Sequence, residues 1–257
     1  MLAVTDMYVR HNKLPAEMII TIRDNLFTPI KDRTDFLWLP GIKYYRNMAD
    51  RLGIEAHSQW ETLPVNTWRE LVSLPLLWSQ ASRGLTAPAQ PHATDRSRHE
   101  TLDILLPGGS IVWSDEHKRL FTAERARREA LAFADARRND PPRIDPKGVA
   151  HMESLLTFLA ENNVKVTLAH PPFNPIFWQA VQGSPYREGL RQVEQLTAGW
   201  AEKFNLPIIG GFSPESVGCT ADMYIDAEHS NAKCLGMLLK QFTGNNDKRK
   251  LRGTLTW

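Results

Sequence analysis

The sequence lacks the features that mark several large classes of protein. Only two cysteines occur in 257 residues, so a framework of several disulfides is excluded, and the redox state of Cys219 and Cys234 stays undecided. Neither lies in a pattern with metal-ligand spacing, and the sequence predicts no metal and no cofactor. Lys and Arg number 31 against 29 Asp and Glu, so the net charge of +2 gives no electrostatic reason to expect binding to nucleic acid.

Long apolar runs are also missing. No stretch approaches the roughly 20 apolar residues of a membrane span, and the first residues lack the charged, apolar and small-residue order of a signal peptide. As written, the chain is expected to be soluble and cytoplasmic. Residues 1–10 have the pattern of a helix with no N-cap residue or turn before it, which predicts that an upstream segment is missing.

What the sequence contains is the alternation of an α/β protein. With 42% hydrophobic and 23% charged residues, the chain can bury one large core, so we expect a single domain over residues 1–257. Short β-branched runs predict buried parallel strands at residues 18–22, 164–169 and 207–210. Helical periodicity predicts helices at residues 122–138, 146–163 and 186–204, and a last one from an N-cap at Ser230 to a stop near Gly244.

The middle of the chain is less regular. Residues 84–98 are rich in Ala, Pro, Thr and Ser, and two short strands are expected around a turn, at residues 102–106 and 110–113. We interpret residues 84–120 as a loop or hairpin insertion into the α/β domain.

Polar residues follow each of the three expected parallel strands. Asp24 and Asn25 follow the first, His170 follows the second, and Asp226 and His229 lie in the loop after the third. Ligands of doubly wound sheets sit at the carboxyl ends of the strands, because loops and helix N-termini converge there.

The last pair has the residue types of a general base and its orienting group. A basic imidazole needs one nitrogen free to take a proton and a carboxylate on the other nitrogen to fix the tautomer. An Asp and a His three residues apart, in a loop that enters a helix, can meet this need locally. The alternative is a capping carboxylate beside a structural histidine.

Residues 224–236 (YIDAEHSNAKCLG) resemble the final block of the SGNH, or GDSL-like, hydrolase superfamily. Residues 164–178, which contain PPFNP at 171–175, and residues 106–111 (LPGGSI) are similar to the branch associated with bacterial surface-polysaccharide and cell-envelope acylation. The resemblance extends from residue 18 to the end and implies a flavodoxin-like three-layer α/β sandwich with a parallel central sheet, incomplete at the N-terminus.

The resemblance also implies roles for individual residues. His229 becomes the general base and Asp226 its orienting partner. Asn25 falls where the family has an oxyanion-hole asparagine, although residues 22–25 here read IRDN, and Asp24 and His170 become candidates for oxyanion or substrate binding. The family's serine lies in a Gly-Asp-Ser-like turn after the first strand, and no such turn precedes residue 18. Ser110 follows two glycines but falls in the wrong part of the order.

The function expected from this resemblance is an esterase or O-acyltransferase that acts on acylated carbohydrate or another small ester. The chain alone is expected to be inactive without the serine block. An N-terminal anchor in the missing segment would place the protein in the periplasm or cell envelope, as in that branch. The oligomeric state does not follow from the sequence.

Two alternatives remain. One is a non-catalytic accessory protein that binds glycan or a partner enzyme on the same scaffold, and its sheet should have no exposed hydrophobic edge. The other is a metal-dependent hydrolase with His170, Asp226 and His229 as ligands. His170 and Asn25 also have a possible structural role. His170 would be hydrogen-bonded in a Pro-rich turn, and Asn25 would form an Asx-turn or a helix cap.

Overall fold

A computed structural model describes residues 2–24, 42–54, 104–105, 111–112, 115 and 119–253. The chain divides into two compact units. The first joins residues 1–56 to residues 123–257 and contains the parallel sheet. The second covers residues 57–122, and its described part includes a short antiparallel pair, β2 (Ile104–Leu105) and β3 (Ile111–Val112). This pair confirms the two strands expected around a turn.

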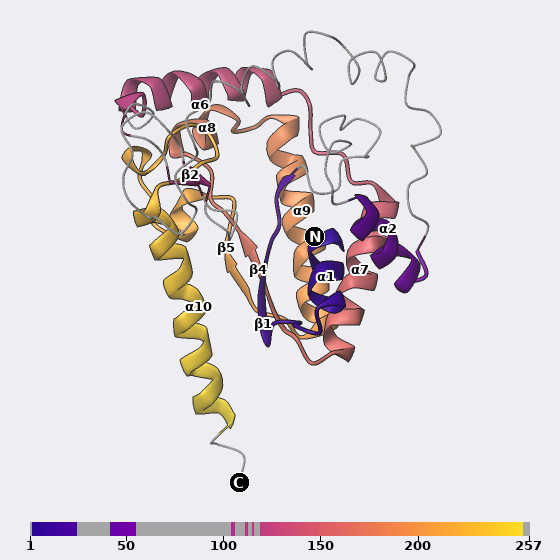
Figure 1. Ribbon diagram of the computed structural model, residues 1–257. Coiled ribbons are helices and arrows are strands. Elements are labelled where there is room, and N and C mark those ends of the chain that lie inside the picture. Colours follow the sequence, from indigo (N-terminus) through magenta and orange to yellow (C-terminus); the bar gives the residue numbers. More distant parts are fainter. Residues whose placement is uncertain are drawn as a thin grey trace, which may run out of the picture. The chain divides into compact units, whose positions relative to one another are not determined.

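The first unit is built on three parallel strands in the order β1-β4-β5, and it is therefore an α/β structure (Figure 1). The strands are β1 (Glu17–Thr21), β4 (Lys165–His170) and β5 (Ile208–Gly210). All three lie where β-branched runs predicted them. Thr21 pairs with Ala169, and His170 pairs with Gly210, so the carboxyl ends of the strands meet at one edge of the sheet.

The prediction that all three strands are buried holds for β4 but is wrong for β1. In the described part of the chain β1 pairs with β4 alone, and Ile19 on β1 is 39% exposed. In β4, the central strand, every residue after Lys165 is buried. A run of β-branched residues predicts a strand, but it does not predict how many neighbouring strands that strand has in the sheet.

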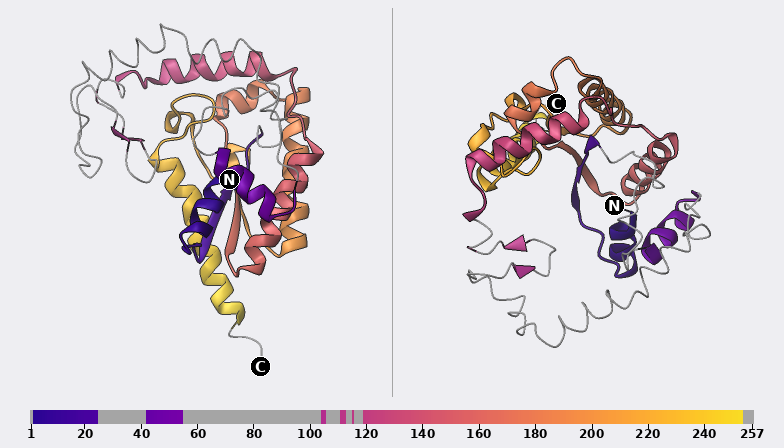
Figure 2. Two further views of the ribbon diagram at one scale, coloured as in Figure 1. Left: turned by 45° about the vertical axis from the view of Figure 1, so that its right-hand side comes forward. Right: turned by 90° about the horizontal axis from the view of Figure 1, so that it is seen from above.

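One face of the sheet packs against helices α7 (Pro146–Glu161) and α9 (Pro185–Phe204), as Figures 1 and 2 show. Both helices begin at a capping residue followed by proline: Asp145 accepts from a backbone N–H of α7, and Ser184 does the same for α9. Their apolar faces form the main core with the strands, through Ile20, Leu168, Leu155, Leu156, Leu159, Leu190, Val193 and Trp200.

The other face of the sheet packs against α10 (Ala232–Gly253), where Leu238 contacts Ala169 and Ile209. Two predicted details of this helix are wrong. Its N-cap is Asn231, whose side-chain oxygen accepts from the backbone of the first turn, and not Ser230. The helix also continues through Gly244, because a single glycine costs a helix only about 1 kcal/mol and does not by itself end it.

The remaining helices among the described residues pack in two pairs. They are α1 (Leu2–Arg10), which packs on α2 (Ile42–Arg51), and α6 (Ala123–Arg137), which packs on α8 (Pro175–Ala180). Two short 3-10 turns, η5 (Pro214–Ser216) and η6 (Ala221–Met223), lie between β5 and α10. Among the described helices, none has the length and apolar character needed to cross a membrane.

Candidate functional site

The loop that carries Asp226 and His229 is held in a fixed shape by its own backbone. Tyr224 and Ser230 form an isolated antiparallel bridge, and the backbone N–H of Ile225 donates to the carbonyl of His229 at 2.8 Å. The loop lies between β5 and α10, at the carboxyl end of the sheet. The sequence prediction placed the pair there correctly, before the helix that packs on the sheet.

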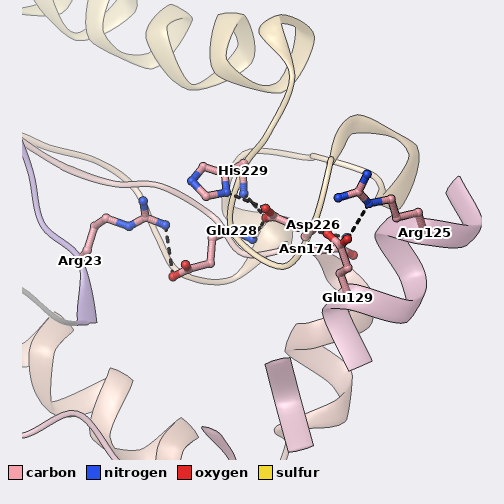
Figure 3. A network of polar contacts seen from close by, with 7 residues as sticks. All are labelled: Arg23, Arg125, Glu129, Asn174, Asp226, Glu228 and His229. Atoms are coloured by element: carbon pink, nitrogen blue, oxygen red, sulfur yellow. Dashed lines mark hydrogen bonds and ion pairs between the residues drawn. The ribbon is translucent and has the colours of Figure 1, made fainter. Parts of the chain in front are cut away.

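Within this loop, Asp226 and His229 are directly paired (Figure 3). Asp226 Oδ2 lies 2.7 Å from His229 Nδ1. The other carboxylate oxygen, Oδ1, accepts hydrogen bonds from the backbone N–H groups of Glu228 at 2.7 Å and His229 at 2.8 Å. Both carboxylate oxygens are therefore engaged, and the carboxylate is oriented toward one nitrogen of the imidazole.

The two groups shift each other's protonation in opposite directions. Burial alone would raise the pKa of Asp226, but the hydrogen bonds from His229 and from the two backbone N–H groups bring it below its usual value. The hydrogen bond to Asp226 raises the pKa of His229, against an opposing effect of burial. Asp226 is consequently ionised at neutral pH, and it stabilises the imidazolium form of His229.

His229 is more exposed to solvent than Asp226, and a general base has to be reachable by the group whose proton it accepts. The side chain of His229 is 63% exposed, whereas that of Asp226 is 28% exposed. With Nδ1 turned toward Asp226, Nε2 is the nitrogen that can exchange a proton with an incoming group. In the described part of the chain no hydrogen bond to Nε2 is found. The arrangement is that of an oriented base open to solvent.

Asn174 fixes the loop to the end of β4, a role that the sequence analysis missed. Its side-chain Nδ2 donates to the backbone carbonyl of Asp226 at 2.9 Å, and its backbone N–H donates to the carbonyl of Ala227 at 2.9 Å. Its side-chain Oδ1 accepts from the backbone N–H of Ile176 and caps α8. The Asn-Pro pair at the start of a helix predicts the cap, but no sequence pattern predicts the contact with Asp226.

A second contact joins the loop to the end of β1 (Figure 3). Arg23 pairs with Glu228 at 3.2 Å, a relationship that the sequence analysis also missed. Burial raises the pKa of Glu228, while Arg23 opposes the shift. The contacts of Arg23 and Asn174 confirm that chain segments from the ends of all three strands meet at this edge.

Asp24 is placed at the same edge but is turned inward. The side chain is buried, and its Oδ2 accepts a hydrogen bond of 2.6 Å from the Tyr186 hydroxyl. Burial, and then the charge of Asp24, raise the pKa of Tyr186 well above its usual value. The second oxygen of Asp24 is buried and has no hydrogen-bond partner. The residue therefore links β1 to α9 and is not displayed beside His229.

His170 likewise points into the protein. It is 2% exposed, and its ring packs edge-on against Phe212 with 4.6 Å between the ring centroids. Burial lowers its pKa to about 4, so the ring is neutral at pH 7. The expected hydrogen bond in the Pro-rich turn is not found at Nδ1, which is buried without a partner.

The structure does not assemble the three residues of the metal-site alternative. Within the described ranges, no group of three or more His, Cys, Asp or Glu is suited to hold a metal ion, and no hydrogen bond joins His170 to Asp226 or His229. Two further candidates, Asn25 and Ser110, lie outside the described residues.

A disulfide closes the loop that contains the pair. Cys219 and Cys234 are buried and bonded to each other, 15 residues apart, so that Asp226 and His229 both lie inside the covalent ring. This settles the redox state that the sequence left undecided. The bond connects the segment after β5 to the first turn of α10, and it limits how far the loop can move.

Comparison of the chain with protein-family models, with curated proteins and with solved structures finds no match.

Proposed function

We propose that this chain provides the aspartate and histidine of an SGNH-type esterase or O-acyltransferase that acts on acylated carbohydrate. His229 is the general base, and Asp226 orients it. The serine that the base activates is not found in a Gly-Asp-Ser-like turn of these 257 residues. We infer that it belongs to a segment that precedes them, and that the chain alone has no activity.

The observation that supports this function is how Asp226 uses its two oxygens. If Asp226 were only a helix cap, its carboxylate would bind the first turn of α10, but Asn231 fills that position. Instead, one oxygen of Asp226 is held by two backbone N–H groups of the loop and the other faces His229 Nδ1. This arrangement fixes the tautomer of an exposed histidine, which a structural histidine does not need.

In the proposed reaction, His229 Nε2 takes the proton of the serine hydroxyl as the serine oxygen attacks the ester carbonyl. Asp226 stabilises the resulting imidazolium. The imidazolium then gives the proton to the departing sugar oxygen, which leaves an acyl-serine. Water or another sugar hydroxyl attacks the acyl group, His229 accepts the proton of that nucleophile, and the same proton returns to the serine as it departs.

The finer fold assignment belongs to the same proposal. A flavodoxin-like three-layer sandwich has a parallel sheet between two helical layers, and here α7 and α9 pack on one face and α10 on the other. In the described residues β1 pairs with β4 alone, and the proposed fold would add a further strand on its other side.

The disulfide supports the second of the two expected locations. Buried disulfides persist in oxidising compartments and are rare in the cytosol, where thiols are kept reduced. The bond between Cys219 and Cys234 therefore favours a periplasmic or cell-envelope protein over a cytoplasmic one.

The test compares p-nitrophenyl acetate hydrolysis by residues 1–257 with hydrolysis by the same chain extended by the residues that its gene encodes upstream. A fluorophosphonate serves as a covalent probe for an activated serine. We expect turnover and a single labelled serine in the extended protein only. His229→Ala should reduce the rate at least ~100-fold, the lower end for a general base, while the exposed His11→Ala serves as the matched control.

Two results would contradict the proposal. Turnover by residues 1–257 alone would place the nucleophile within them. A folded extended protein with neither turnover nor label would favour the non-catalytic accessory function.

A further inference from the structure

We propose that the apolar pocket beneath α10 binds the acyl chain of the ester, and that the preferred acyl group has about eight carbons. This inference rests on the proposed function, because it assigns a substrate class to the same site. The pocket lies between the sheet and α10, with a volume of about 280 Å³. Eleven residues line it, among them Ile19 and Thr21 of β1, Ser230 of the loop, and Leu235, Leu238 and Leu239 of α10.

The residues that line the pocket favour the binding of an alkyl chain. Nine of the eleven lining residues are Ile, Leu, Ala, Pro or a disulfide-bonded Cys, and none carries a charge. An ionic or sugar ligand would lose its hydration in such a pocket without gaining hydrogen bonds in return. An alkyl chain loses only unfavourable contact with water.

The two polar lining residues lie at the end of the pocket that meets the loop carrying Asp226 and His229. Thr21 is the last residue of β1, and Ser230 directly follows His229. From this end the pocket follows the first turns of α10, past Cys234 to Leu239, a rise of about 7.5 Å along the helix. An ester bound with its carbonyl near Ser230 would therefore place its acyl chain along α10.

The volume of the pocket sets the length of the acyl chain that it can hold. A water molecule in the liquid takes about 30 Å³, and a methylene group is similar in size, so the pocket has room for roughly eight or nine such groups. An acetyl group would leave most of the pocket empty. Exposed Ile19, Leu235 and Leu239 lie among its lining residues, and an acyl chain would cover part of their apolar surface.

Binding can be measured without any catalysis. We would titrate the folded protein with straight-chain carboxylates of two to ten carbons and measure each dissociation constant by isothermal titration calorimetry. Each buried methylene should tighten binding about fourfold, as expected for hydrocarbon moved out of water. The gain should stop near eight carbons, when the pocket is full.

Two substitutions test whether the acyl chain lies in this pocket. Thr21→Trp fills the pocket from an exposed position on β1, and Leu239→Gln makes its lining polar. Both should weaken octanoate binding at least tenfold. Leu131→Gln on α6 is the matched control, because Leu131 is 38% exposed, compared with 40% for Leu239, and does not line the pocket. It should leave binding unchanged.

Affinity that does not depend on chain length, or that falls equally in Leu131→Gln, would overturn the proposal. So would a failure of octanoate to bind combined with a self-association that Thr21→Trp abolishes, since the pocket would then be an interface between copies of the chain. Chain-length-dependent binding by a protein whose extended form has no esterase activity would keep the pocket and reject the proposed reaction.

Discussion

The side-chain amide of Asn174 donates a hydrogen bond of 2.9 Å to the backbone carbonyl of Asp226, a residue 52 positions later in the chain. The same asparagine caps α8 through its side-chain oxygen. One buried residue thereby ties the loop after β4 to the loop that carries the candidate base. Its donor and its acceptor have separate partners, so their contributions can be separated by mutation.

Asn174→Asp should keep the cap of α8 and lose the bond to Asp226, whereas Asn174→Ala should lose both. We expect Asn174→Ala to reduce the free energy of unfolding by about 2–4 kcal/mol, from a lost cap and a buried carbonyl left without its donor. Urea unfolding measures this loss. In Asn174→Asp, NMR titration of His229 should show a changed pKa although the cap remains. An unchanged His229 titration would mean that the contact does not position the pair.

The pKa of His229 should fall when its partner is neutralised. Asp226→Asn removes the charge that favours the imidazolium, so the titration midpoint in NMR should move toward lower pH. Asp222→Asn, at an exposed acidic residue four positions earlier, is the control and should not move it. If both variants shift the midpoint equally, the effect reflects the net charge of the loop and not the paired geometry.

The same shift predicts the pH dependence of activity and of stability. His229 accepts a proton only when neutral, so the rate of the extended enzyme should rise as pH increases through a midpoint above about 6.5, the ordinary histidine pKa. Because the folded-state pKa is the higher one, the pair contributes its full stabilisation below the unfolded pKa and loses it as pH rises through the folded pKa. A rate midpoint well below 6.5 would argue against His229 as the base.

Reduction of the disulfide should destabilise the protein. Closing a loop of about 15 residues contributes about 3 kcal/mol in the chain-entropy model, so dithiothreitol should lower the urea midpoint of the wild-type chain. A double variant with Cys219→Ser and Cys234→Ser should start from the lower midpoint and not respond to the reductant. Equal sensitivity of the wild type and the double variant would show that the reductant acts elsewhere.

His170 should make the protein sensitive to mild acid. Its pKa falls to about 4 on burial, so the unfolded state binds a proton that the folded state does not as pH falls from about 6.5 to about 4. Stability is lost across this window, by about 3 kcal/mol for this difference in pKa. Urea unfolding at pH 7 and pH 4.5 should show a larger loss in the wild type than in His170→Gln. Equal losses would assign the acid sensitivity to other groups.

The sequence by itself predicted the α/β alternation, the three parallel strands and the position of the Asp226 and His229 pair. These features are encoded locally, since hydrophobic periodicity and turn residues act over a few positions and the pair is three residues apart. Local patterns were less reliable at boundaries. Ser230 and Asn231 are both good capping residues, and only the geometry of the first turn of α10 selects Asn231.

The tertiary structure alone decided which residues meet across long separations. Nothing in the sequence indicates that Asn174 holds the carbonyl of Asp226, that Arg23 pairs with Glu228, or that Cys219 bonds to Cys234. The tertiary structure also buries the side chains of Asp24 and His170, although both residues lie at the ends of strands, where ligand-binding residues are expected. A strand end fixes where a residue lies along the sheet, but the packing of the surrounding helices determines whether its side chain faces solvent or the core.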